Sequence, residues 1–139
     1  MKTVYATVAH VSGARDGKGR TEDGKLEVSL STPKALGGAD GPGTNPEQLF
    51  ALGYAACFES ALRFVSKAAG KAVSDARMSA RVSLVSDDAG GLKLAVDLIG
   101  VIPGLSKDET QHLLEAAHQI CPYSKATRGN VDVTLIVGD

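Results

Sequence analysis

A mostly apolar segment at residues 49–65 limits the possible folds of this chain more than any other part of the sequence. It is apolar almost all round, which is typical of a helix buried at the centre of a domain. Glu59 and Arg63 interrupt it, so we do not expect it to span a membrane. A chain with this segment is expected to fold around one long central helix.

The ends of this helix are marked by local signals. Pro46 suits its first position, while Thr44 and Glu47 have the spacing of a capping box. Gly70 suits a position just beyond its C-terminus, where a left-handed backbone is common. These signals predict a helix over residues 45–69.

Segments of alternating apolar and polar residues predict strands at residues 4–9, 26–30, 78–84, 92–98 and 131–137. A turn at 87–91 joins two of them as a hairpin, which excludes a simple alternating βαβ series. Ser106 and Glu109 form a second capping box and open a second helix, which Pro122 discourages from continuing. The expected fold is α+β, with mainly antiparallel sheets and two helices in one domain over residues 1–139.

Length and composition exclude several classes of protein. The 139 residues are 43% hydrophobic and 22% charged, with a formal net charge of -1, as in a soluble globular domain. Charged residues are scattered and form no basic patch, so nucleic acid is not an expected partner. The N-terminus lacks the apolar run of a signal peptide, and we therefore expect a cytosolic location.

The two cysteines are the candidate reactive groups. In the cytosol Cys57 and Cys121 are not expected to form a permanent structural bridge, so each is either core filler or a reactive thiol. On a helix, Glu59, Arg63 and Lys67 form one charged stripe, because they are spaced by four residues. Cys57 lies on the opposite side, toward the interior. Burial would raise the pKa of its thiol, so Cys57 needs a nearby cation to act as a nucleophile.

Several segments resemble the signature of the Ohr/OsmC family, and in particular its organic hydroperoxide resistance branch rather than the osmotically inducible branch. They are TNPEQLF at 44–50, GYAACF at 53–58, CPYS at 121–124, TRGN at 127–130 and ARDG at 14–17. The family commonly has glycine where Ala14 stands. The resemblance covers essentially the whole chain, and it implies an OsmC-like fold and an intertwined homodimer.

The resemblance also implies a reaction and its residues. It implies that Cys57 is the peroxidatic cysteine and that Cys121 is the resolving cysteine. It also implies that Arg15, held by Glu47, stabilises the Cys57 thiolate. The implied substrates are organic hydroperoxides, with no bound cofactor and with dihydrolipoyl groups on carrier proteins as the external reductant. Without the resemblance, Arg15 would be interpreted as a solvated loop charge and Glu47 as part of the capping box.

The expected cycle follows thiol redox chemistry. Cys57 attacks the peroxide and becomes a sulfenic acid, Cys121 condenses with it to a disulfide, and an external dithiol reduces that disulfide. Cys121 lies where the second helix ends, a junction that suits a movable thiol and equally a passive helix end. The apolar surroundings of Cys57 favour a peroxide with a hydrophobic tail.

One distance constrains this interpretation. Glu47 and Cys57 are ten residues apart on one predicted helix, which separates them by roughly 15 Å. Either the helix is broken near Gly53, or the Arg15–Glu47 pair serves Cys57 of another chain. The family's intertwined dimers favour active sites shared between two chains.

Three other interpretations remain open at this stage. A zinc or iron site could use His118 and Cys121, with His112 and Cys57 as additional ligands. A cysteine hydrolase could use His10, His112 or His118 as its base. The third is a non-enzymatic protein on the same fold, which senses redox state or binds a small molecule.

Overall fold

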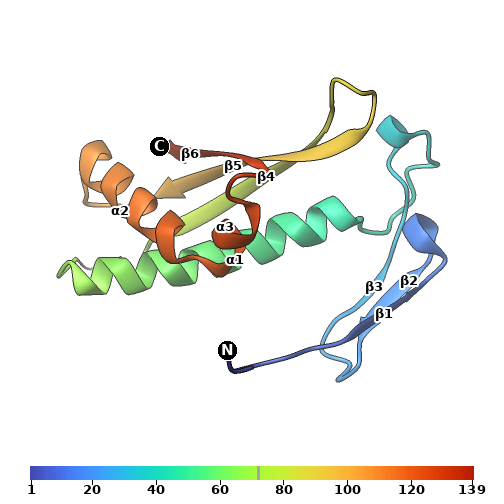
Figure 1. Ribbon diagram of the computed structural model, residues 1–139, viewed down its shortest axis with the longest axis horizontal. Helices are drawn as coiled ribbons and strands as arrows, with labels where there is room; N and C mark the ends of the chain where they lie inside the picture. Colours follow the sequence, from blue (N-terminus) through green and yellow to red (C-terminus); the bar gives the residue numbers. More distant parts are fainter. Residues whose placement is uncertain (72) are drawn as a thin grey trace. The chain divides into compact units, whose positions relative to one another are not determined.

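The long helix predicted from the apolar segment is present as α1, Pro46–Ala68, and it is continuous (Figure 1). It ends in a Schellman motif centred on Gly70, which has a left-handed backbone with φ of 71°. The N–H of Gly70 donates to the carbonyl of Lys67 at 3.0 Å, and that of Lys71 donates to Ser66 at 2.9 Å. The predicted stop is therefore confirmed.

The start of α1 uses a different cap from the predicted one. Asn45 is the capping residue, because its Oδ1 accepts the backbone N–H of Gln48 at 2.9 Å. Thr44 donates its hydroxyl to the side chain of Gln48 at 2.7 Å. The predicted capping box of Thr44 and Glu47 is wrong, since the Glu47 carboxylate accepts hydrogen bonds from Arg15 instead.

The computed structural model describes residues 1–71 and 73–139. Their contacts divide the chain into two compact units, Met1–Leu49 and Phe50–Asp139, and α1 begins in the first and continues into the second. Each unit has its own sheet. The expectation of a single domain over residues 1–139 stays a prediction.

The first unit contains an antiparallel sheet of order β1-β2-β3. Its strands and two short 3-10 helices are β1 Ala9–Ser12, η1 Ala14–Asp16, β2 Lys18–Thr21, β3 Glu27–Ser29 and η2 Lys34–Leu36. β3 confirms the strand predicted at 26–30. β2 was not predicted, because residues 13–19 are polar and rich in glycine, a composition typical of a connection.

The first predicted strand, residues 4–9, is placed too early. Pairing with β2 begins at Ala9, which lies opposite Thr21, and β1 extends from there to Ser12. Val4 and Val8 are exposed. A strand needs a hydrogen-bonded partner, and alternation of residue types alone could not show where the partner begins.

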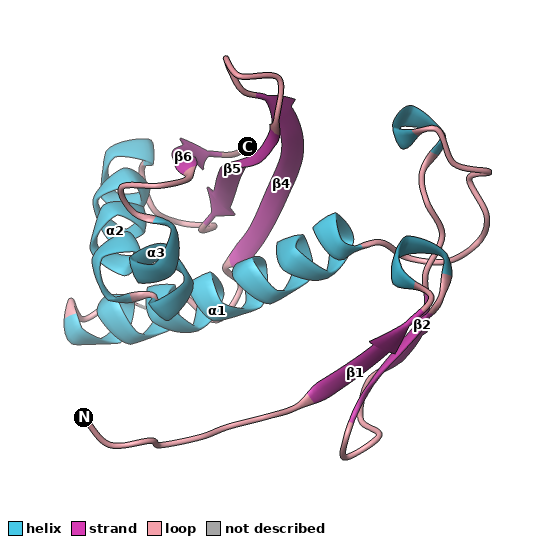
Figure 2. Cartoon of the chain, turned by 45° about the vertical axis from the view of Figure 1, so that its right-hand side comes forward, coloured by secondary structure: helices cyan, strands magenta, loops and turns pink. Residues whose placement is uncertain are grey.

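The second unit contains a sheet of order β4-β5-β6 and the remaining helices (Figure 2). Its elements are β4 Arg77–Ser86, β5 Leu92–Val101, α2 Lys107–Ile120, α3 Pro122–Thr127 and β6 Asp132–Val137. β4 and β5 form the predicted antiparallel hairpin, whereas β6 pairs with β5 in parallel after the crossover through α2 and α3. Together with the first sheet, this confirms an α+β fold with mainly antiparallel sheets.

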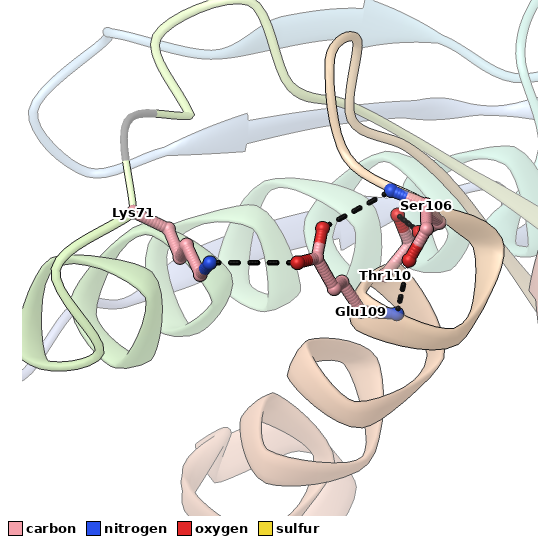
Figure 3. Close-up of polar contacts among 4 residues, drawn as sticks. All are labelled: Lys71, Ser106, Glu109 and Thr110. Carbon is pink, nitrogen blue, oxygen red and sulfur yellow. Dashed lines mark hydrogen bonds and ion pairs between the residues drawn. The ribbon is translucent and has the colours of Figure 1, made fainter.

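The second capping box is present as predicted (Figure 3). Ser106 Oγ accepts the N–H of Glu109 at 3.1 Å, and the Glu109 carboxylate accepts the N–H of Ser106 at 3.1 Å. Lys71, beyond the end of α1, donates to the same carboxylate at 3.5 Å. The start of α2 is thus fixed by its own sequence and linked to the end of α1.

The prediction of two helices missed α3. Cys121 leaves helical geometry with an extended backbone, φ of -61° and ψ of 124°, so α2 ends as expected. Pro122 then occupies the first turn of α3, where its missing N–H costs nothing. A proline that stops one helix therefore starts the next, and the described residues contain three α-helices.

The core of the second unit lies between the sheet and the helices. Val96 and Leu98 of β5 belong to the same buried cluster as Phe58 and Leu62 on one face of α1. α1 is buried along this face only, and Leu52 and Phe64 elsewhere on it are 69% and 70% exposed. By length and composition alone α1 could cross a membrane, a property that it shares with core helices of soluble proteins.

Candidate active site

The two cysteines lie together in the second unit. Cys57 is in the middle of α1, and Cys121 is the single residue between α2 and α3. Their Sγ atoms are 3.6 Å apart, and both are free thiols. Since the sulfurs of a disulfide are about 2.05 Å apart, closing the bond requires an approach of about 1.5 Å. A reversible disulfide is therefore within reach of a small movement.

The electrostatics of Cys57 follow from its position. Burial raises the pKa of its thiol, and the neighbouring Cys121 thiol raises it further. The backbone N–H of Tyr123, in the first turn of α3, acts in the opposite direction by hydrogen bonding to the sulfur. The increase in the pKa agrees with the prediction that Cys57 needs a cation before it can ionise near neutral pH.

A hollow of about 350 Å³ adjoins the Cys57 thiol. Its lining is mostly apolar and comes from α1, the end of α2 and the start of α3. The lining residues are Cys57, Ser60, Ala61, Phe64, Ile120 and Pro122. An apolar hollow beside a thiol suits a substrate whose reactive group carries a hydrocarbon tail.

Gly53 does not break α1, which is continuous through it. Instead, the absence of a side chain makes room for Tyr123, because a Cβ at Gly53 would lie 2.9 Å from the Tyr123 hydroxyl oxygen. The Tyr123 ring also packs 5.6 Å from the ring of Tyr54 and 6.1 Å from that of Phe50. These contacts hold the start of α3 against α1, one turn before Cys57.

Arg15 and Glu47 form a bidentate pair in the first unit. Arg15 Nη1 and Nη2 donate to Glu47 Oε2 and Oε1, each at 2.8 Å. The Arg15 bond holds the pKa of the Glu47 carboxyl below its usual range, so the pair is ionised at neutral pH. Arg15 is thus held in a fixed orientation and is not a freely solvated loop charge.

The backbone that presents Arg15 is unusually constrained. Ala14 has φ of 50°, a left-handed conformation that favours glycine and explains why a glycine suits this position. Gly17 must be glycine, because a Cβ there would lie 1.7 Å from the carbonyl oxygen of Ser12. Asp16 anchors the loop by accepting the N–H and hydroxyl of Thr32 at 3.0 and 2.8 Å.

None of the histidines bonds a thiol in the part of the chain that the structure describes. Residues 1–71 and 73–139 also contain no cluster of three or more potential metal ligands. His118 Nδ1 instead bonds Ser124 Oγ at 2.8 Å, and His10 lies 3.9 Å from Glu22. The geometry therefore favours neither the metal site nor the histidine-assisted hydrolase.

Sequence reasoning missed Tyr123 and Ser124 as members of the site. Both lie on α3, the helix that was not predicted, directly after Cys121. Tyr54 was missed as well, although it lies three residues before Cys57 and therefore on the same side of α1. A search along that helix face would have found Tyr54, but only the fold brings Ser124 to it.

Comparisons with known proteins agree on one family. The model of the family "OsmC-like protein" matches residues 37–136. An organic hydroperoxide resistance protein from Xanthomonas axonopodis pv. citri (strain 306) is 47% identical over 139 residues, covering 96% of this chain and 94% of the relative.

Solved structures are similar over the whole length. A crystal structure of an organic hydroperoxide resistance protein from Legionella pneumophila has a TM-score of 0.92 at 48% identity, covering 99% of this chain and all of that one. That of OhrB from Bacillus subtilis has a TM-score of 0.90 at 42% identity, covering 98% of this chain and 100% of that one.

Proposed function

Because this chain belongs to the organic hydroperoxide resistance branch of the OsmC-like proteins, we propose that it detoxifies organic peroxides as a thiol peroxidase. The observation that carries the proposal is the pair of free thiols of Cys57 and Cys121, 3.6 Å apart beside an apolar hollow. The proposed substrates are alkyl and fatty-acid hydroperoxides, whose tails suit the hollow.

The reaction proceeds in two protein steps. The Cys57 thiolate attacks the terminal oxygen of the hydroperoxide, the O–O bond breaks, and the alkoxide leaves as the alcohol after taking up a proton. Cys57 is then a sulfenic acid. The Cys121 thiol attacks its sulfur, an S–S bond forms, and the hydroxyl leaves as water.

A dithiol from outside the chain completes the cycle. It reduces the Cys57–Cys121 disulfide by exchange and is itself oxidised to a disulfide. We propose a dihydrolipoyl group on a carrier protein as this reductant, on the basis of the family resemblance alone, and no bound cofactor. The proposed location is the cytosol, where thiols are kept reduced, without nucleic acid or membrane as partners.

The Arg15–Glu47 pair is proposed to stabilise the Cys57 thiolate of a second copy of the chain. The continuous helix α1 supports this proposal over a bend near Gly53. Several large apolar side chains are exposed in the single chain. They are Val4, Tyr5 and Val11 before the Arg15 loop, and Leu52 and Phe64 on α1. An intertwined homodimer would bury such surfaces and share its active sites between chains.

The proposal is tested by following loss of an alkyl hydroperoxide with a dithiol present. We expect many turnovers per chain, and none in Cys57→Ser, with Ser66→Ala, which removes a hydroxyl on the same helix outside the hollow, as the control. A chain that forms the disulfide but does not turn over would instead be the non-enzymatic redox sensor. Full activity in Cys57→Ser would refute the assignment.

A further inference from the structure

A buried chain of hydrogen bonds connects all three helices around Cys121. His118 Nδ1 bonds Ser124 Oγ at 2.8 Å, and Ser124 Oγ bonds the Tyr54 hydroxyl at 2.9 Å. The Tyr54 hydroxyl also bonds Thr127 Oγ1 at 3.1 Å, and Thr127 Oγ1 donates to the carbonyl of Ser124 at 3.2 Å. Tyr54, Ser124 and Thr127 are buried.

The four hydrogen bonds can all form at once with only one assignment of donors and acceptors. The Thr127 proton is used on the Ser124 carbonyl, so Tyr54 must donate to Thr127. The Tyr54 proton is then used, so Ser124 must donate to Tyr54, and His118 must donate to Ser124 through Nδ1. Burial lowers the pKa of His118, which favours the neutral ring. A neutral ring that donates through Nδ1 has no proton on Nε2.

The network surrounds the point where Cys121 leaves α2. His118 lies in the last turn of α2 and Ser124 in α3, so their bond spans the corner that contains Cys121. Tyr54 is three residues before Cys57, so the same network ties that corner to the helix that carries the other thiol. The three hydroxyls of this network are buried and bonded, which makes it rigid, because each broken bond would leave a buried hydroxyl without a partner.

We infer that His118, Ser124 and Tyr54 are positioning residues that hold Cys121 at the distance from Cys57 required for disulfide formation. The inference rests on the proposed function, in which Cys121 is the resolving thiol. These residues do not touch the peroxide, and they act through the placement of the Cys121 sulfur. Their loss therefore slows resolution of the sulfenic acid and leaves its formation unchanged.

A redox titration against glutathione tests this placement without peroxide. The equilibrium gives the effective concentration of the Cys121 thiol at the Cys57 thiol, which is high when the fold holds the two close together. We expect Ser124→Ala and Tyr54→Phe each to lower it about tenfold. Ser66→Ala is the matched control, because Ser66 Oγ is buried on α1 and bonds nothing in the part of the chain that the structure describes. It should change the value less than about twofold.

The outcomes separate this inference from the proposed function. Wild-type effective concentrations in both Ser124→Ala and Tyr54→Phe would overturn it, and if Ser124→Ala does not fold, Tyr54→Phe, which keeps the ring in the core, decides. Nitrogen-15 spectra must show the Nδ1–H tautomer of His118, and the Nε2–H tautomer would contradict the network. A wild-type chain that consumes no peroxide would refute the peroxidase but leave the titration valid.

Discussion

Arg15 and Glu47 are joined by two parallel hydrogen bonds of 2.8 Å, which tie the loop after β1 to the first turn of α1. The Glu47 side chain is 17% exposed and that of Arg15 is 38% exposed. The Arg15 guanidinium uses one edge of its N–H groups to bond Glu47, and this holds its positive charge in a fixed position. In the proposed mechanism this charge offsets the burial that raises the pKa of Cys57.

Glu47→Gln tests the pair through the pH dependence of stability. The Arg15 bond lowers the folded-state pKa of Glu47 below its unfolded value of about 4.3. Its stabilising contribution is therefore present at pH 7 and is lost as pH falls through the folded-state pKa. We expect Glu47→Gln to melt below the wild type at pH 7, with the difference shrinking below about pH 4. A constant difference in melting temperature across this range would contradict the ion pair.

Mixing two inactive variants tests the shared active site. Arg15→Ala retains Cys57, and Cys57→Ser retains Arg15, so each homodimer should be inactive. After subunit exchange at equal amounts, half the dimers are mixed and each has one complete site of two. We expect about a quarter of wild-type turnover. A mixture as inactive as its components would place the Arg15 and Cys57 of one site on the same chain.

Cys121→Ser separates the two protein steps. Sulfenic acid forms at Cys57 as in the wild type, but no thiol 3.6 Å away can resolve it. We expect rapid consumption of about one equivalent of peroxide per chain, followed either by a stall or by slow over-oxidation of Cys57 to the sulfinic acid, which uses a second equivalent. Mass spectrometry of the intact chain measures these products. Sustained wild-type turnover would show that Cys121 is not the resolving thiol.

Ala14→Gly should stabilise the protein. Ala14 has φ of 50°, where a Cβ is strained and glycine is not. Relief of this strain exceeds the added freedom of glycine in the unfolded chain, and we expect a gain of about 0.5–1 kcal/mol in the free energy of unfolding. Denaturant titration measures it. Gly24→Ala is the opposite control, because Gly24 also has a positive φ, of 74°, and this substitution should destabilise the protein.

Local rules predicted much of the fold. The apolar segment predicted α1, Gly70 predicted its end, and Ser106 with Glu109 predicted the start of α2. Each of these signals acts within a few residues, so no distant contact is needed to interpret it. The same reasoning failed for Glu47, whose carboxylate bonds Arg15, 32 residues away, instead of capping its own helix.

The residue chemistry of this protein can be inferred from the sequence alone: two cysteines, one on an apolar helix, and motifs shared with organic hydroperoxide resistance proteins. The fold was needed to show that Cys57 and Cys121, 64 residues apart, lie with their Sγ atoms 3.6 Å from each other. It was also needed to show that Pro122 starts a helix whose Ser124 bonds Tyr54 in the core. The reason is physical: side-chain type is local, but burial and hydrogen-bond partners depend on which distant segments pack together.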